Sequence, residues 1–185
     1  MPGLVLEGGT FRPVFSCGVM DALLDNDIMF DYVIGVSAGI TYAASYLSRQ
    51  RERNINILRQ YRGDKRYFGA RNLLHDHSIF GTDFVFDTIP NQLVPFDWDE
   101  FHKYQGKCLV GVTNAKTGKA EYLDGMRMDR PCTMLRATCA IPIYFPPGQM
   151  DILRRRSGRP NPDSAQPARR QRAQSDRAHA AGKLP

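Results

Sequence analysis

The chain has 185 residues, of which 42% are hydrophobic and 19 are aromatic, enough for one domain with a sizeable core. Its formal net charge of +6 comes entirely from residues 151–185, because residues 1–150 carry 16 basic and 16 acidic side chains. This distribution excludes a strongly basic globular surface. The four cysteines and four histidines show neither C-x-x-C nor metal-ligand spacing. With no secretory signal or membrane-spanning run either, we expect a cytoplasmic protein with reduced thiols and no metal or cofactor.

Strands and helices alternate in the first fifty residues. Residues 3–7 predict a buried strand that ends at a Gly-Gly pair, and a helix is expected from residue 14 to about residue 26. Residues 31–34 predict a second strand, and an Ala-rich stretch over residues 38–48 predicts a second helix. We expect the inner side of the first helix to carry Val14, Cys17, Gly18, Ala22 and Leu23. The alternation predicts an α/β layered fold with a mainly parallel central sheet flanked by helices.

A basic segment follows at residues 49–66, with Ile55, Leu58 and Tyr61 at helical spacing. Its basic side chains could form a nucleic-acid or phosphoinositide surface, or the solvated face of a helix. The neutral balance of residues 1–150 favours the solvated face, so we expect no nucleic-acid partner.

Residues 67–100 are rich in loop-forming residues and contain the aromatic side chains Tyr67, Phe68, Phe80, Phe84, Phe86, Phe96 and Trp98. These side chains could line a pocket for an acyl chain, or pack beneath long loops. Further along, residues 108–114 and 120–123 predict two strands joined by a turn. A short helix is expected over residues 134–140, followed by an extended segment over residues 142–147.

The sequence G-V-S-A-G at residues 35–39 lies between the second predicted strand and its helix. A strand, a sharp turn and a helix with serine at the apex form a nucleophile elbow. Gly35 and Gly39 suit this turn, because strand and helix backbones come close together there and a Cβ would clash. The helix N-terminus beside the hydroxyl favours developing negative charge. Ser37 is therefore the candidate nucleophile.

A glycine-rich loop, E-G-G-T-F-R at residues 7–12, follows the first predicted strand. Its backbone N–H groups can point at one oxygen beside the elbow, as an oxyanion hole requires. The alternative is a phosphate-binding loop, but neither G-x-G-x-x-G spacing nor a Walker lysine is present. Dinucleotide binding is therefore the weaker interpretation.

The order of the two motifs differs from that of an ordinary α/β-hydrolase, whose elbow lies well downstream. It resembles the patatin-like phospholipases, whose pattern is D/E-G-G-G-x-R-G, then G-x-S-x-G, a helix–proline segment and finally D-G-G or D-G-A. The matching segments are residues 7–13, residues 35–39, Leu135–Pro142 and the Phe-Pro-Pro at residues 145–147. The resemblance covers residues 3–147 and implies the layered α/β fold of that family.

By this resemblance Ser37 would be the nucleophile of a Ser–Asp dyad that cleaves lipid acyl esters without metal, cofactor or catalytic histidine. The backbone N–H groups of Gly8, Gly9 and Thr10 would form the oxyanion hole, and Arg12 would hold the loop. The implied partners are a lipid or acyl-ester substrate and, peripherally, a membrane surface, with the oligomeric state left open. An ordinary Ser-His-Asp esterase using His102 is the alternative enzyme, which the motif order disfavours.

The chain departs from the family pattern in the glycine loop. The third glycine is replaced by Thr10, which keeps an N–H but ordinarily requires negative φ. The glycine after the arginine is replaced by Pro13, which has no N–H to donate.

A second departure concerns the end of the pattern, because no D-G-G or D-G-A follows Pro147. Residues 148–185 instead form an Arg/Pro/Ala-rich tail without aromatic residues. We therefore divide the chain into a partial catalytic domain, residues 1–147, and a tail that is out-of-frame translation, genuinely disordered, or a nucleic-acid-binding arm, in that order of preference. The fold is then C-terminally incomplete, and a truncated, inactive copy that at most binds lipid is the alternative to an active hydrolase.

Overall fold

A computed structural model describes residues 2–75, 78–115, 117–140 and 152–153. The predicted extended segment at residues 142–147 and nearly all of the predicted tail lie outside these residues. The central sheet has the order β1-β2-β3-β4, with a further short strand, β5, paired with β3. The strands are β1 (Leu4–Leu6), β2 (Tyr32–Val36), β3 (Lys107–Asn114), β4 (Ala120–Asp124) and β5 (Ile152–Leu153).

The first three strands are parallel, and β4 and β5 are antiparallel to β3. In the register, Leu6 of β1 lies beside Gly35 of β2, and Val36 lies beside Gly111 of β3. The glycine loop and the elbow therefore leave the sheet at the same edge, the carboxyl ends of parallel strands, where α/β proteins place their ligands. The predicted fold class, an α/β fold with a mainly parallel sheet, is confirmed.

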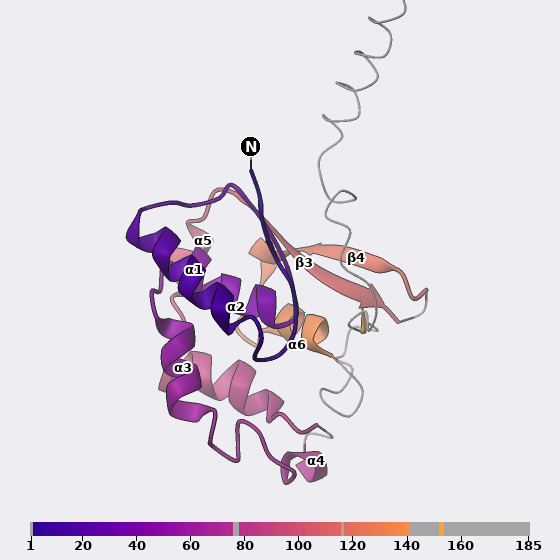
Figure 1. The fold of residues 1–185 in the computed structure, drawn as a ribbon. Coiled ribbons are helices and arrows are strands. Elements are labelled where there is room, and N and C mark those ends of the chain that lie inside the picture. The colour runs from indigo at the N-terminus through magenta and orange to yellow at the C-terminus, as the bar shows by residue number, and fades with distance from the viewer. Residues whose placement is uncertain (1, 76–77, 116, 141–151, 154–185) are drawn as a thin grey trace, which may run out of the picture.

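The helix after β2 is the centre of the helical layer. This helix, α2 (Ala38–Leu47), is buried along nearly its whole length, in keeping with its small and mostly apolar side chains and its lack of charge. It contacts β2 and packs against the surrounding helices, with α1 beside it and α3 beyond (Figure 1). The other helices are α1 (Val14–Asp25), α3 (Arg53–Tyr61), α4 (Asn72–His75), η1 (Phe84–Leu93), α5 (Trp98–His102), η2 (Gly125–Arg127) and α6 (Thr133–Cys139).

The inner face of α1 differs from the predicted one. Cys17 and Met20 are its fully buried residues, whereas Val14, Gly18 and Ala22 are exposed. The helix packs mainly against α2 and α3, and these two helices cover a narrower face of α1 than the one predicted. The prediction was wrong for those three exposed residues.

The prediction of a loop-rich segment at residues 67–100 was also wrong in part. Residues Phe84–Leu93 form η1, a helix with the wide hydrogen-bonding turns of a π-helix and Pro90 inside it. Proline removes a backbone donor and crowds the preceding turn of an α-helix, and a wider turn accommodates it. Phe84, Phe86 and Ile89 are buried, so packing of the apolar side chains stabilises a helix that Pro90 would otherwise break.

Most of the basic segment around α3 is a solvated surface with local charge pairing, but the prediction was wrong for Arg53, whose side chain lies largely buried against a cavity. Arg49 donates to Asp27 at 2.8 Å, and Arg51 donates to Asp25 at 2.5 Å, with all four side chains substantially exposed. This pairing fits the neutral charge balance of the domain. None of the helices in the described part of the chain combines the length and the hydropathy needed to cross a membrane.

Candidate active site

Ser37 lies at the junction of β2 and α2 in a strained backbone conformation. Its φ is 54° and its ψ is −131°, a combination that residues with a Cβ rarely adopt. Such strain persists only where the surrounding structure enforces it, and it clusters at functional sites. The side chain is 5% exposed, at the edge of a cavity described below.

The two glycines of the elbow lie where another side chain would collide with backbone. A Cβ at Gly39 would come within 2.6 Å of the carbonyl oxygens of Leu6 and Glu7. A Cβ at Gly35 would lie 2.8 Å from the backbone nitrogen of Ile40. These contacts hold the start of α2 directly against β1 and β2, which brings the elbow beside the glycine loop.

The backbone at Ser37 is fixed by Thr138 of α6, a residue that is distant in sequence and adjacent in space. The N–H of Ser37 donates to the Thr138 hydroxyl at 2.8 Å, and that hydroxyl donates to the carbonyl of Gly111 at 2.6 Å. Thr138 is fully buried, so water cannot replace these bonds. On the other side, Thr41 of α2 donates from its hydroxyl to the carbonyl of Ser37 at 3.2 Å.

The glycine loop has two residues with positive φ. Gly9 has a φ of 144°, and the guanidinium of Arg12 packs where a Cβ of Gly9 would lie, with Nε at 2.8 Å from that position. Thr10 has a φ of 57°, so the expectation that it requires negative φ was wrong for this structure. Tyr42 of α2 donates its hydroxyl to the Thr10 carbonyl at 3.2 Å, which ties the loop to the helix that carries the elbow.

A cavity opens beside Ser37 and brings the two motifs together. Ser37 and Thr10 both line it, whereas Gly8, Gly9 and Arg12 do not. The rest of its wall is largely apolar and aromatic, made by Phe11, Ala38, Thr41, Tyr42, Tyr67, Phe80, Val85, Phe86 and Cys139. Some of the aromatic residues that the sequence singled out thus line a cavity, while Phe84 packs edge-on against Tyr61 in the core.

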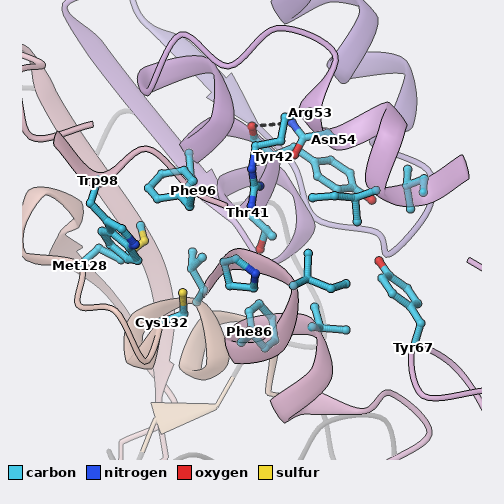
Figure 2. A pocket seen from close by; sticks show the side chains of 17 residues that line it. Thr41, Tyr42, Arg53, Asn54, Tyr67, Phe86, Phe96, Trp98, Met128 and Cys132 are labelled. Carbon is cyan, nitrogen blue, oxygen red and sulfur yellow. Dashed lines mark hydrogen bonds between the residues drawn. The ribbon is translucent and has the colours of Figure 1, made fainter. Parts of the chain in front are cut away.

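A second, somewhat larger cavity lies next to residues that also line the first, and Figure 2 shows the side chains around it. The two cavities share five lining residues, namely Thr41, Tyr42, Tyr67, Val85 and Phe86. The second one extends from there between α2, α3 and η1 to Phe96 and Trp98. Both cavities have largely apolar linings, which suit a hydrocarbon chain, and Ser37 lines the first of them.

No Asp, Glu or His among the described residues lines the cavity at Ser37. His102 is exposed and stacks on Trp98 with ring centroids 6.1 Å apart. Burial raises the pKa of Tyr67, which lines both cavities, to about 12, so its hydroxyl stays protonated at neutral pH. The part of the chain that the structure describes also holds no cluster of three or more His, Cys, Asp or Glu side chains that could bind a metal ion.

Three polar residues around Ser37 had no role in the sequence analysis: Thr41, Tyr42 and Thr138. Thr41 lies four residues after Ser37, and residues four apart in a helix are neighbours. The sequence could therefore have indicated that Thr41 lies beside the nucleophile candidate. Thr138 belongs to the segment that resembles the family's helix–proline motif, but its contact with Ser37 spans 101 residues. Only the folded structure shows that long-range contact.

The comparisons with known proteins agree with this arrangement. The sequence model of the family "Patatin-like phospholipase" matches residues 4–154, which include the glycine loop, the elbow and α6. The search among curated proteins gave no significant match. Because the family match covers most of the chain, the protein belongs to the patatin-like phospholipases, a family of lipid acyl hydrolases.

Proposed function

We propose that Ser37 is the nucleophile of a serine lipid acyl hydrolase. The observation that carries this proposal is the strained Ser37 backbone at an elbow that opens into an apolar cavity. In the reaction, Ser37 Oγ attacks the ester carbonyl carbon, the new O–C bond forms, and the alcohol leaves with the proton of the serine. Water then attacks the acyl-enzyme, releasing the fatty acid and restoring the hydroxyl.

The negative charge on the carbonyl oxygen needs donors on the loop side of Ser37. Backbone N–H groups of Gly8, Gly9 and Thr10 are the proposed donors, and Thr10 shares the cavity with Ser37. Arg12, packed on Gly9, is proposed to hold the loop in shape. The N-terminus of α2 adds a favourable field for the same charge.

We propose further that the proton acceptor of the dyad is missing, because no D-G-G or D-G-A motif follows Pro147 in the sequence. We infer that the family's aspartate has been lost through a change of reading frame after the Phe-Pro-Pro segment, close to residue 154, where the family match ends. Positioned general-base catalysis contributes about 10²–10⁴ in rate. Ser37 in this chain is therefore expected to react slowly with esters.

The arginine run at residues 154–156 supports the change of frame. Every arginine codon has G as its second base. A frame that starts one nucleotide later therefore reads each arginine codon as GNN, which encodes Val, Ala, Asp, Glu or Gly. Three consecutive arginines can thus be read as Asp-Gly-Gly. The first of them lies seven residues beyond Pro147, on the side of the helix–proline segment where the family pattern has its aspartate.

The nucleotide sequence from the Phe145 codon onward tests this inference directly. We expect the neighbouring frame to give Asp-Gly-Gly or Asp-Gly-Ala at these codons and a globular composition after it. If the neighbouring frame encodes neither the motif nor a globular composition, the Arg/Pro/Ala-rich tail is part of the genuine protein. The alternative function, an inactive copy that at most binds lipid, would then apply.

Covalent labelling separates a nucleophilic Ser37 from an inert one. A fluorophosphonate should attach to Ser37 of the full chain, as located by mass spectrometry, and the Ser37→Ala variant should lose the label. Ser16→Ala, on α1 and away from the cavity, is the matched control and should label like the parent. Labelling that survives Ser37→Ala would overturn the assignment.

A peripheral membrane contact is proposed where apolar side chains are exposed. Phe15 of α1 is 80% exposed and Leu74 of α4 is 79% exposed. Phe15→Asp and Leu74→Asp should each lower co-sedimentation with phospholipid vesicles. Unchanged binding in both variants would contradict a contact through these helices.

A further inference from the structure

The end of the larger cavity that lies away from Ser37 holds a cation that forms no ion pair with any of the described residues. Arg53 is the one charged residue among the described residues that line this cavity. It donates from its terminal nitrogens to the Val94 carbonyl at 2.7 Å and to the Ser45 hydroxyl at 3.3 Å. Both of these partners are neutral. Burial lowers the pKa of Arg53 to about 10, which still leaves the guanidinium protonated at pH 7.

Two buried N–H groups at this end have no hydrogen-bond partner within the described part of the chain. They are the Nε of Arg53 and the indole Nε1 of Trp98. Trp98 is only 6% exposed, and its ring nitrogen lies on the side that faces the cavity (Figure 2). A buried donor without an acceptor costs free energy comparable to a lost hydrogen bond, so such donors are rare unless a ligand completes them.

The two donors belong to one wall of the cavity. The guanidinium of Arg53 lies over the Phe96 ring at 5.3 Å, and the Phe96 and Trp98 rings are 4.8 Å apart. A further cation, Arg130, lies 5.9 Å from the Trp98 ring on the exposed side. Asp97 and Asp99 lie with Arg130 along the neighbouring surface hollow, so Arg53 is the charge that lines the larger cavity itself, and the described residues shared with the cavity at Ser37 are uncharged.

We propose that this end of the cavity binds the carboxylate of an amphiphile, with Arg53 Nε and Trp98 Nε1 donating to its oxygens. The hydrocarbon chain of the ligand then lies along the shared aromatic wall and points toward Ser37. Guanidinium and indole donors in a water-poor site match a carboxylate, because charge-assisted hydrogen bonds offset the burial of both charges.

Two kinds of ligand carry such a carboxylate, and they differ in the chemical group that they place at Ser37. One is a free fatty acid, whose apolar end lies at the serine. The other is an ester whose acyl chain ends in a carboxylate, so that the ester lies at the serine and the carboxylate at Arg53. The second reading rests on the function proposed above and names the substrate class; the carboxylate site itself does not depend on that function.

Trp98 is the only tryptophan of the chain, so intrinsic fluorescence reports on this site alone. The experiment titrates the full chain carrying Ser37→Ala with octanoate, with 1-octanol and with monomethyl suberate, all below their micellar concentrations. Octanoate is expected to change Trp98 emission saturably and to bind more tightly than 1-octanol. Monomethyl suberate binding more tightly than octanoate identifies the ester ligand, and the reverse order identifies the fatty acid.

Arg53→Met should weaken octanoate binding by about 10–100-fold, the effect of one charge-assisted hydrogen bond, and leave 1-octanol unchanged. Arg59→Met is the matched control, because Arg59 is an exposed residue of the same helix. Equal loss of both ligands in Arg53→Met, or equal affinity of the parent for both, would overturn the carboxylate site.

A second variant keeps the test decisive if Arg53→Met does not fold. Trp98→Phe removes the indole donor and keeps an aromatic ring, and calorimetry replaces fluorescence as the readout. It should weaken octanoate and leave 1-octanol unchanged, whereas equal effects on both ligands would contradict the proposal. Because all titrations use Ser37→Ala, an inert Ser37 does not affect the outcome.

Discussion

The hydroxyl of Thr138 accepts a hydrogen bond from the backbone N–H of Ser37 at 2.8 Å, across 101 residues of sequence. The same hydroxyl donates to the Gly111 carbonyl in the middle of the sheet at 2.6 Å. The strained backbone of the elbow is therefore held by a residue of α6, and the position of Ser37 depends on how α6 packs against β3.

Thr138→Val tests this anchor, because valine has nearly the same shape and no hydroxyl. We expect the free energy of unfolding to fall by about 1–3 kcal/mol, the cost of leaving a buried N–H unsatisfied. Thr138→Ser keeps the hydroxyl and should lose less. Chemical denaturation of the two variants measures the difference, and equal stability of valine and serine would show that the hydroxyl does not hold the elbow.

Gly39→Ala should be strongly destabilising, because the added Cβ would lie 2.6 Å from two backbone carbonyl oxygens. We expect a loss above the usual range of about 0.5–3 kcal/mol for single substitutions. Gly18→Ala in the exposed part of α1 is the control, since no atom lies within 4 Å of its Cβ position. That change should raise stability by about 0.5–1 kcal/mol, the helix preference of alanine over glycine. Similar effects in both variants would contradict the close approach at the elbow.

Thr10 has a φ of 57°, where a side chain costs about 1–2 kcal/mol relative to glycine. Thr10→Gly relieves this strain, whereas Thr10→Ala keeps it. The glycine variant should therefore be more stable than the alanine variant by about 1 kcal/mol in thermal or chemical unfolding. An alanine variant at least as stable as the glycine variant would mean that the loop relaxes to negative φ.

The buried cysteines should make the fold sensitive to alkaline pH. Burial raises the pKa of Cys17, Cys108 and Cys132 from 9.0 to about 12. The unfolded chain therefore loses these protons first, so the stabilisation is complete below pH 9 and is lost as pH rises from 9 toward 12.

Thiol reactivity checks the same shifts at a milder pH. At pH 8 the native thiols should react with Ellman's reagent far more slowly than those of the unfolded chain. Raising a thiol pKa from 9 to about 12 lowers the fraction of thiolate about a thousandfold. The chain in guanidinium chloride is the reference. Native thiols that react as fast as the reference would contradict the burial.

The sequence was most informative where the local structure depends on residues that are close together along the chain. The elbow follows from glycine spacing between a strand and a helix, and the structure has Ser37, Gly35 and Gly39 at that junction. The strand pair β3–β4 and helix α6 were likewise predicted and are confirmed. Each of these elements carries its own turn or periodicity signal.

The features that the sequence analysis failed to predict depend on packing between segments that are distant in sequence. Helix η1 forms in spite of Pro90, because Phe84, Phe86 and Ile89 are buried in the domain core. The inner face of α1 depends on which helices cover it, and the Arg53 cavity is assembled from several separate segments. Neither periodicity nor motif spacing reports on such contacts.

The central claim is that Ser37 is a patatin-like nucleophile whose partner the reading frame has removed. The most direct measurement is hydrolysis of a p-nitrophenyl acyl ester by this chain, by the chain translated after removal of one nucleotide at the start of the Arg154 codon, and by Ser37→Ala in that frame. We expect turnover in the second protein, none above background in its Ser37→Ala variant, and at least about 10²-fold less in this chain. Equal turnover in all three proteins would contradict the claim.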